Sequence, residues 1–113
     1  MTMTFFKFLG NKIIVNWMAK SSNPSEQSLN ASYGDVLSFE WSGNHTQNVY
    51  LFPDQTAFDN CNFTDADFLG SSSQTTFTLA SFPTYFGLKM TCHAGHKLAV
   101  LSGTVAFIDK AIK

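Results

Sequence analysis

The chain has 113 residues, which suffices for one domain with a single hydrophobic core, and no linker, internal repeat or low-complexity tract divides it. Its formal net charge is −1 and only 13% of its residues are charged, which argues against a protein that follows the phosphates of a nucleic acid. The 12 Phe residues, together with abundant Ser and Thr, favour strands over helices. We therefore expect a single domain over residues 1–113.

The chain begins with two apolar-rich runs that the turn-type pair Gly10-Asn11 separates, and both runs are predicted to be strands. Further along, residues 36–41 alternate between two faces, with Leu37 and Phe39 on the side expected to be buried. Residues 53–72 are expected to be irregular, with one helical turn near 66–69. Short strands without amphipathic helices predict an all-β sandwich. The predicted strands are eight segments: 4–8, 12–17, 29–32, 36–41, 48–52, 75–79, 84–90 and 97–106.

No targeting or transmembrane segment is visible at the start of the chain. Residues 1–18 are apolar in patches, but Lys7, Asn11 and Lys12 interrupt them, so no continuous hydrophobic stretch remains. We expect the chain to be a mature form, with Met1 in the place of a removed leader. Three N-x-S/T sequons suit a secreted protein and make N-glycosylation a prediction at Asn30, Asn44 and Asn62.

Three motifs occur in a fixed order along the chain. The first is G-D-V-L-S-F at 34–39, followed by N-V at 48–49, the second is F-D-N-C-N at 58–62, and the third is C-H-A-G-H-K-L-A-V at 92–100. Together they resemble the phytocyanins, small secreted cupredoxins that fold as copper-binding β-sandwiches. The resemblance spans roughly 29–100. It implies a cupredoxin-like Greek-key β-sandwich of about eight strands.

The resemblance also implies that Cys61 and Cys92 form one disulfide. On the loop-entropy model, such a bond stabilises the fold by roughly 3 to 4 kcal/mol in an oxidising compartment. The residues alone leave open a second interpretation, in which the two cysteines are buried free thiols of a cytosolic domain.

The residues that make phytocyanins blue do not all carry over. In a blue copper centre, two histidines and a cysteine thiolate hold the metal, with a weak axial Met or Gln. On the phytocyanin pattern the first histidine becomes Gln47, the second becomes Thr91, and the axial residue becomes His96. Residues 85–92, which match the stretch with the ligand cysteine, contain none before Cys92. The resemblance therefore implies that the standard blue site is lost.

All three histidines nevertheless lie in the two segments that form the metal-bearing end of a cupredoxin. His45, His93 and His96 are therefore predicted ligands of a non-blue copper site, with Gln47 or Met90 as further donors. The plainer interpretation is that they are exposed loop histidines, or hydrogen-bonding residues left over from a lost site.

A rival alignment keeps the thiolate. Cys92, His96 and residues 101–105 are similar to the ligand loop of the bacterial azurins. In that alignment His45, Cys92 and His96 form a blue site, and Cys61 is unpaired. The spacing from Cys92 to His96 is one residue short, and Leu101 stands at the axial position.

Three hypotheses about function follow. The first is a secreted cupredoxin-fold protein that binds copper through histidines and acts in electron transfer or copper handling, with a redox or cell-surface partner. The second is a metal-free extracellular binding module like the early-nodulin-like relatives of phytocyanins, and the third is an azurin-like electron carrier that uses Cys92. Enzyme activity is not expected, because no phosphate-binding glycine loop or G-x-S-x-G motif is present.

Overall fold

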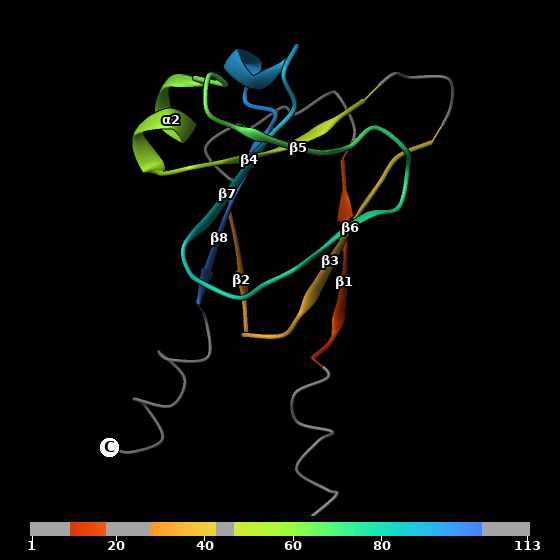
Figure 1. The fold of residues 1–113 in the computed structure, drawn as a ribbon. Helices are drawn as coiled ribbons and strands as arrows, with labels where there is room; N and C mark the ends of the chain where they lie inside the picture. The colour runs from red at the N-terminus through yellow and green to blue at the C-terminus, as the bar shows by residue number, and fades with distance from the viewer. Residues whose placement is uncertain (1–9, 18–27, 43–46, 103–113) are drawn as a thin grey trace, which may run out of the picture.

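The computed structural model describes residues 10–17, 28–42 and 47–102. These residues form eight strands in two sheets, together with a short helix and one 3-10 turn (Figure 1). The strands are β1 (Lys12–Asn16), β2 (Ser28–Ala31), β3 (Val36–Glu40), β4 (Val49–Phe52), β5 (Asp67–Gly70), β6 (Thr75–Thr78), β7 (Thr84–Gly87) and β8 (Lys97–Ser102), and the helical segments are α2 (Gln55–Asn60) and η2 (Cys92–Ala94). The expected all-β sandwich of eight strands is confirmed.

The smaller sheet has the order β1-β3-β6, with β1 parallel and β6 antiparallel to β3. The alternation predicted for residues 36–41 is confirmed on its core side, where Leu37 and Phe39 are fully buried. On the opposite face Ser38 is also buried, and its hydroxyl donates a hydrogen bond to Glu40 Oε2 at 2.8 Å. The neighbouring carboxylate therefore satisfies the hydroxyl group of this buried serine.

The larger sheet has the order β2-β8-β7-β4-β5. Its inward side chains meet those of the smaller sheet, and the Phe39 and Phe86 rings lie 5.0 Å apart across the core. Burial of apolar surface in this shared core is the main stabilising term, at about 25 cal/mol per Å² removed from water. The core is formed by Trp17, Ala31, Leu37, Phe39, Val49, Leu79, Phe86, Leu88, Leu98 and Val100.

A second, smaller cluster lies on the outer face of the larger sheet, where Phe52, Ala57, Tyr85 and Cys92 are buried. Helix α2 covers this face, and its Phe58 ring lies 4.9 Å from the Tyr85 ring of β7. Gly87 of β7 permits this packing, because a Cβ there would lie 2.6 Å from the Phe52 ring. The sheet is therefore covered on both faces in this region.

The predicted helical turn at 66–69 is wrong. Residues 67–70 form β5, which pairs antiparallel with β4, and the helix lies earlier, at Gln55–Asn60. Asp54 starts α2, since its Oδ1 accepts a hydrogen bond from the Ala57 N–H at 2.9 Å. The helix ends at Cys61, which has a left-handed backbone conformation with φ of 51°.

The predicted bond between Cys61 and Cys92 is confirmed, with the two Cα atoms 5.9 Å apart. It joins the end of α2 to η2. These two helical segments form a layer on the outer face of β7, which we call the covering layer, and the bond holds them together. The protein has two cysteines, both in this bond.

The G-D motif at 34–35 has a structural role. The buried carboxylate of Asp35 accepts hydrogen bonds from the Asn11 and Ser32 N–H groups, each at 2.9 Å. Gly34 has a φ of 89°, and a Cβ on Gly10 would lie 2.2 Å from the Gly34 carbonyl oxygen. The turn before β3 and the segment before β1 are thus tied together.

Several strand ends differ from the prediction. The predicted strand at 84–90 ends at Gly87, because residues 88–91 turn into η2. The strand predicted at 97–106 is β8 up to Ser102, and its remainder lies outside the described residues, as does the predicted strand at 4–8. In the described part of the chain, neither helical segment has the length and apolar character that crossing a membrane requires.

Candidate metal centre

The candidate metal ligands come from loops at one end of the larger sheet. Gln47 precedes β4, Leu88 to Thr91 follow β7, and His96 precedes β8. Strand β7 runs antiparallel to both β4 and β8, so these three segments meet at the same end of the sheet. We refer to this end as the loop pole.

His96 is buried in the loop pole, with 3% of its surface exposed. Its Nδ1 lies 2.9 Å from the Thr91 hydroxyl oxygen, and its ring lies 4.6 Å from the Trp17 ring. Its Nε2 is buried and has no hydrogen-bond partner among the described residues. Burial lowers the pKa of His96 from 6.5 to about 4, because the charged imidazolium loses its hydration. The ring is therefore neutral at physiological pH.

Gln47 is buried beside the same tryptophan. It is 3% exposed, and its Nε2 donates a hydrogen bond to the Trp17 carbonyl oxygen at 2.8 Å. The Trp17 Nε1 in turn donates to the Asn48 carbonyl oxygen at 2.8 Å. The Gln47 amide nitrogen thus helps to hold the Trp17 backbone in place, and Gln47 as a copper donor stays a prediction.

Leu88 occupies the position at which the phytocyanin pattern Y-F-x-C, counted from Tyr85, places the ligand cysteine. Its side chain is 1% exposed and belongs to the main core cluster. An aliphatic side chain has no electron pair to donate to a metal, and close packing in the core leaves little room for one. The apolar core thus extends to the place where the family has its thiolate.

The other predicted ligands that the structure describes after β7 differ from His96 in burial. His93 and Met90 are exposed, the latter by 85%, whereas His96 is buried. His45 lies outside the described residues, as does the predicted glycosylation site Asn44. Within the described ranges, no group of three or more His, Cys, Asp or Glu side chains is placed to hold a metal ion. The histidine-based copper site therefore stays a prediction.

The disulfide bears directly on the azurin-like alternative. That alternative needs Cys92 as a free thiolate, but its sulfur is bonded to Cys61. With neither cysteine free, the chain has no thiolate for a blue copper centre. The residues at the loop pole do not fit a blue site.

Two residues that shape the loop pole were not recognised from the sequence as part of it. No motif in the sequence connects Trp17 with this end of the sheet, yet it contacts both Gln47 and His96. Leu88 was not singled out, because the sequence showed only that a cysteine is missing from residues 85–91. The Y-F pair at 85–86 could have identified it, because the pattern Y-F-x-C places the ligand cysteine three residues after the tyrosine.

The remaining predicted modification sites are accessible. Asn30 on β2 and Asn62 after α2 are both exposed, and Asn62 Oδ1 accepts a hydrogen bond from the Thr64 N–H at 3.0 Å. Their glycosylation stays a prediction.

No protein-family model matches the chain, and no curated protein sequence matches it significantly. Among solved structures, spinach plantacyanin is similar at 22% identity and a TM-score of 0.62, covering 80% of this chain and 98% of its own. Cucumber stellacyanin with Cu²⁺ is similar at 22% identity and a TM-score of 0.59, covering 83% and 98%. Cucumber basic protein, a blue copper protein, is similar at 23% identity and a TM-score of 0.57, covering 79% and 98%. With its eight strands, two sheets and one disulfide, the chain has the cupredoxin-like fold of the phytocyanins.

Proposed function

We propose that this chain is an extracellular binding module with a cupredoxin-like fold, which acts without a blue copper centre and not as an enzyme. The observation that supports this most is the replacement of the thiolate position by the buried Leu88, while Cys92 is held in a disulfide. The disulfide also favours an oxidising compartment such as the cell exterior. A cell-surface or cell-wall component is the kind of partner that such a module would bind.

A second function has one specific observation in its favour. The Nε2 of His96 is buried without a hydrogen-bond partner among the described residues, and a metal ion is one way to satisfy such a nitrogen. In this alternative His45, His93 and His96 bind Cu(II) without a thiolate, and the protein hands copper or electrons to a redox partner. Gln47 and Met90 are further donors.

Titration with Cu(II), followed by calorimetry and by visible absorption, separates the two functions. The binding module should take up no stoichiometric copper and should stay colourless. The histidine site should bind one ion and give a pale complex, because no thiolate is present to produce an intense charge-transfer band. An intense blue or green complex would contradict both functions and would imply that Cys92 is free.

Variants identify the ligands if one site is found. His96→Ala should then weaken binding at least tenfold, or about 1.4 kcal/mol, and binding should weaken at acid pH because protons compete for the coordinating imidazoles. His45→Ala and His93→Ala should weaken binding as well, because these imidazoles are the other ligands of this alternative. Equal affinity in the parent and in the variants at positions 45, 93 and 96 would exclude the histidine site.

A further inference from the structure

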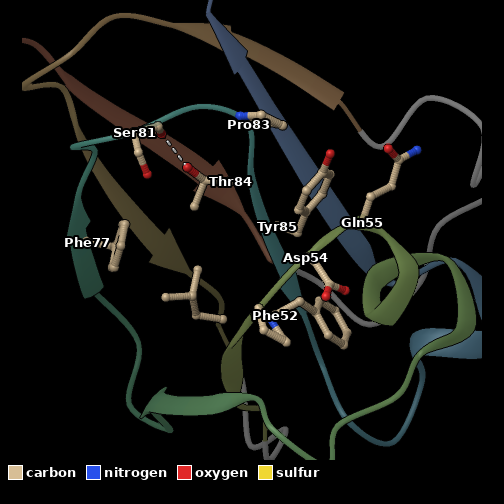
Figure 2. Close-up of a pocket in the computed structure, with 10 residues that line it drawn as sticks. Phe52, Asp54, Gln55, Phe77, Ser81, Pro83, Thr84 and Tyr85 are labelled. Carbon is tan, nitrogen blue, oxygen red and sulfur yellow. Dashed lines mark hydrogen bonds between the residues drawn. The ribbon is translucent and has the colours of Figure 1, made fainter.

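A recess of about 510 Å³ lies at the ends of β4 and β7 that are opposite to the loop pole. It is lined by the last residues of β4, the segment that leads into α2, the ring of Phe77 on β6, and the start of β7 (Figure 2). Its volume falls in the range of about 300 to 1,000 Å³ that is typical of small-molecule sites. None of the predicted metal ligands that the structure describes lines it.

The apolar part of the recess is rigid. Phe77 is half-buried and packs 5.3 Å from the core ring of Phe86, and Pro83 is an exposed apolar residue elsewhere in the lining. Tyr85 is backed by the Phe58 ring at 4.9 Å. These side chains provide an apolar surface that does not have to be ordered when a ligand binds, which lowers the entropic cost of binding.

Polar groups surround this surface. Asp54 and Gln55 are exposed, and Figure 2 shows them together with the Tyr85 hydroxyl on the α2 side of the recess. On the other side the Thr84 hydroxyl donates a hydrogen bond to the Ser81 carbonyl oxygen at 2.6 Å. Asp54 uses its Oδ1 to cap α2, so Oδ2 of this exposed carboxylate is the oxygen that can accept a hydrogen bond from a ligand. The rim thus offers both donors and acceptors.

The charge of the residues that line the recess excludes some classes of ligand. Asp54 is the one charged side chain among the described residues that line the recess, so phosphates, sulfates and carboxylates would be repelled. An organic cation is held best over an open aromatic face. Here Tyr85 and Phe52 are only 9% and 3% exposed and Phe77 is half-buried, so none of these rings offers a cation a fully open face. A neutral ligand fits better.

We propose that this recess binds a neutral saccharide of one or two sugar units. The apolar C–H face of a sugar ring would lie on Phe77 and Pro83. Its hydroxyl groups, which both donate and accept, would bond to the side chains of Asp54, Gln55 and Tyr85. This inference rests on the proposed function, because it names the ligand class of the binding module.

The test is an NMR titration of the ¹⁵N-labelled protein with cellobiose, lactose, maltose and N,N′-diacetylchitobiose. We expect at least one of them to shift the amides of residues 54, 55, 84 and 85 saturably, at concentrations of up to about 50 mM, well above a Kd of about 1 mM. Tyr85→Phe keeps the ring but removes the hydroxyl, and it should weaken binding at least fivefold. No saturable shift with any of the four sugars would overturn the proposal.

A charge-neutral variant separates a saccharide from a cation. Asp54→Asn retains a good helix N-cap, so it should leave the fold intact. It should weaken sugar binding only a few-fold, whereas Asp65→Asn, at an exposed residue outside the recess, should not change it. Binding of choline in place of the sugars, lost in Asp54→Asn, would overturn the saccharide assignment. The copper titration tests the proposed function, whereas the sugar titration tests only the ligand class. A negative sugar titration can therefore be distinguished from a failure of the proposed function.

Discussion

His96 is placed where a histidine cannot easily carry a charge. Its ring is enclosed by Trp17 and Thr91, and burial lowers its pKa to about 4. In the unfolded chain the pKa returns to about 6.5, so the unfolded state binds a proton more readily than the folded state. The stabilising effect of the neutral ring is thus fully present above about pH 6.5 and is lost as the pH falls toward 4.

We predict that the free energy of unfolding drops between pH 6.5 and pH 4 by up to about 3 kcal/mol because of this one group. His96→Gln, whose amide stays neutral and can still bond to Thr91, should remove that part of the pH dependence. Urea denaturation of both proteins at several pH values measures the difference. His93→Gln, a change at an exposed residue, is the control. Parallel pH profiles for the parent and His96→Gln would show that His96 titrates normally.

The limits of sequence reasoning are also visible in this residue. His96 was predicted as a ligand because it lies, with the other two histidines, in the segments that form the metal-bearing end of a cupredoxin. Its burial depends on Trp17, which is distant in the sequence and reaches it only through the packing of the two sheets. No local pattern contains that information.

At the scale of single elements, the strands were more predictable than the helix. Residues of β3 alternate between a buried and an outer face, and this period of two is visible in the sequence. Helix α2 has only six residues, too few to show a helical period, and its start depends on the Asp54 cap. In β5, pairing with β4 overrides the composition of residues 53–72, for which an irregular segment was expected.

The disulfide is the link between α2 and the rest of the molecule. Cys61 ends α2 and Cys92 begins η2, so the bond holds the covering layer over Phe52 and Tyr85. We predict that titration of the denatured, unreduced protein finds no free thiols. The double variant Cys61→Ser, Cys92→Ser should lose about 3 to 4 kcal/mol of stability, because the unfolded chain regains the freedom of the closed loop.

Hydrogen exchange can show which part of the molecule loses stability when the disulfide is removed. The amides of α2 should exchange faster in the double variant than in the parent, relative to the amides of β3, because α2 lies outside the main core cluster. Unchanged protection of α2 together with unchanged stability would mean that the bond contributes nothing to this layer.

At the scale of the whole molecule, Trp17 connects the two sheets. It follows β1 of the smaller sheet, where its N–H donates to the Glu40 carbonyl oxygen at 2.8 Å. Its indole donates to the Asn48 carbonyl oxygen, and its own carbonyl oxygen accepts from Gln47, both just before β4 of the larger sheet. The ring itself is 2% exposed and packs on Phe39 at 5.0 Å. One residue thus closes the core at the loop pole.

We predict that Trp17→Phe lowers the free energy of unfolding by about 2 to 4 kcal/mol, because it leaves a cavity in the core and removes the hydrogen bond to the Asn48 carbonyl oxygen. Unfolding should remain a single transition, since both sheets share one core. Urea denaturation followed by far-UV circular dichroism and by the fluorescence of the remaining Trp41 should give one midpoint.

Trp41→Phe is the matched control. Trp41 is only half-buried, and its backbone N–H keeps its bond to Ser73 in the variant. The loss in the free energy of unfolding should therefore stay below about 1 kcal/mol. Two separate midpoints in Trp17→Phe would instead show that the sheets unfold independently once this connection is weakened.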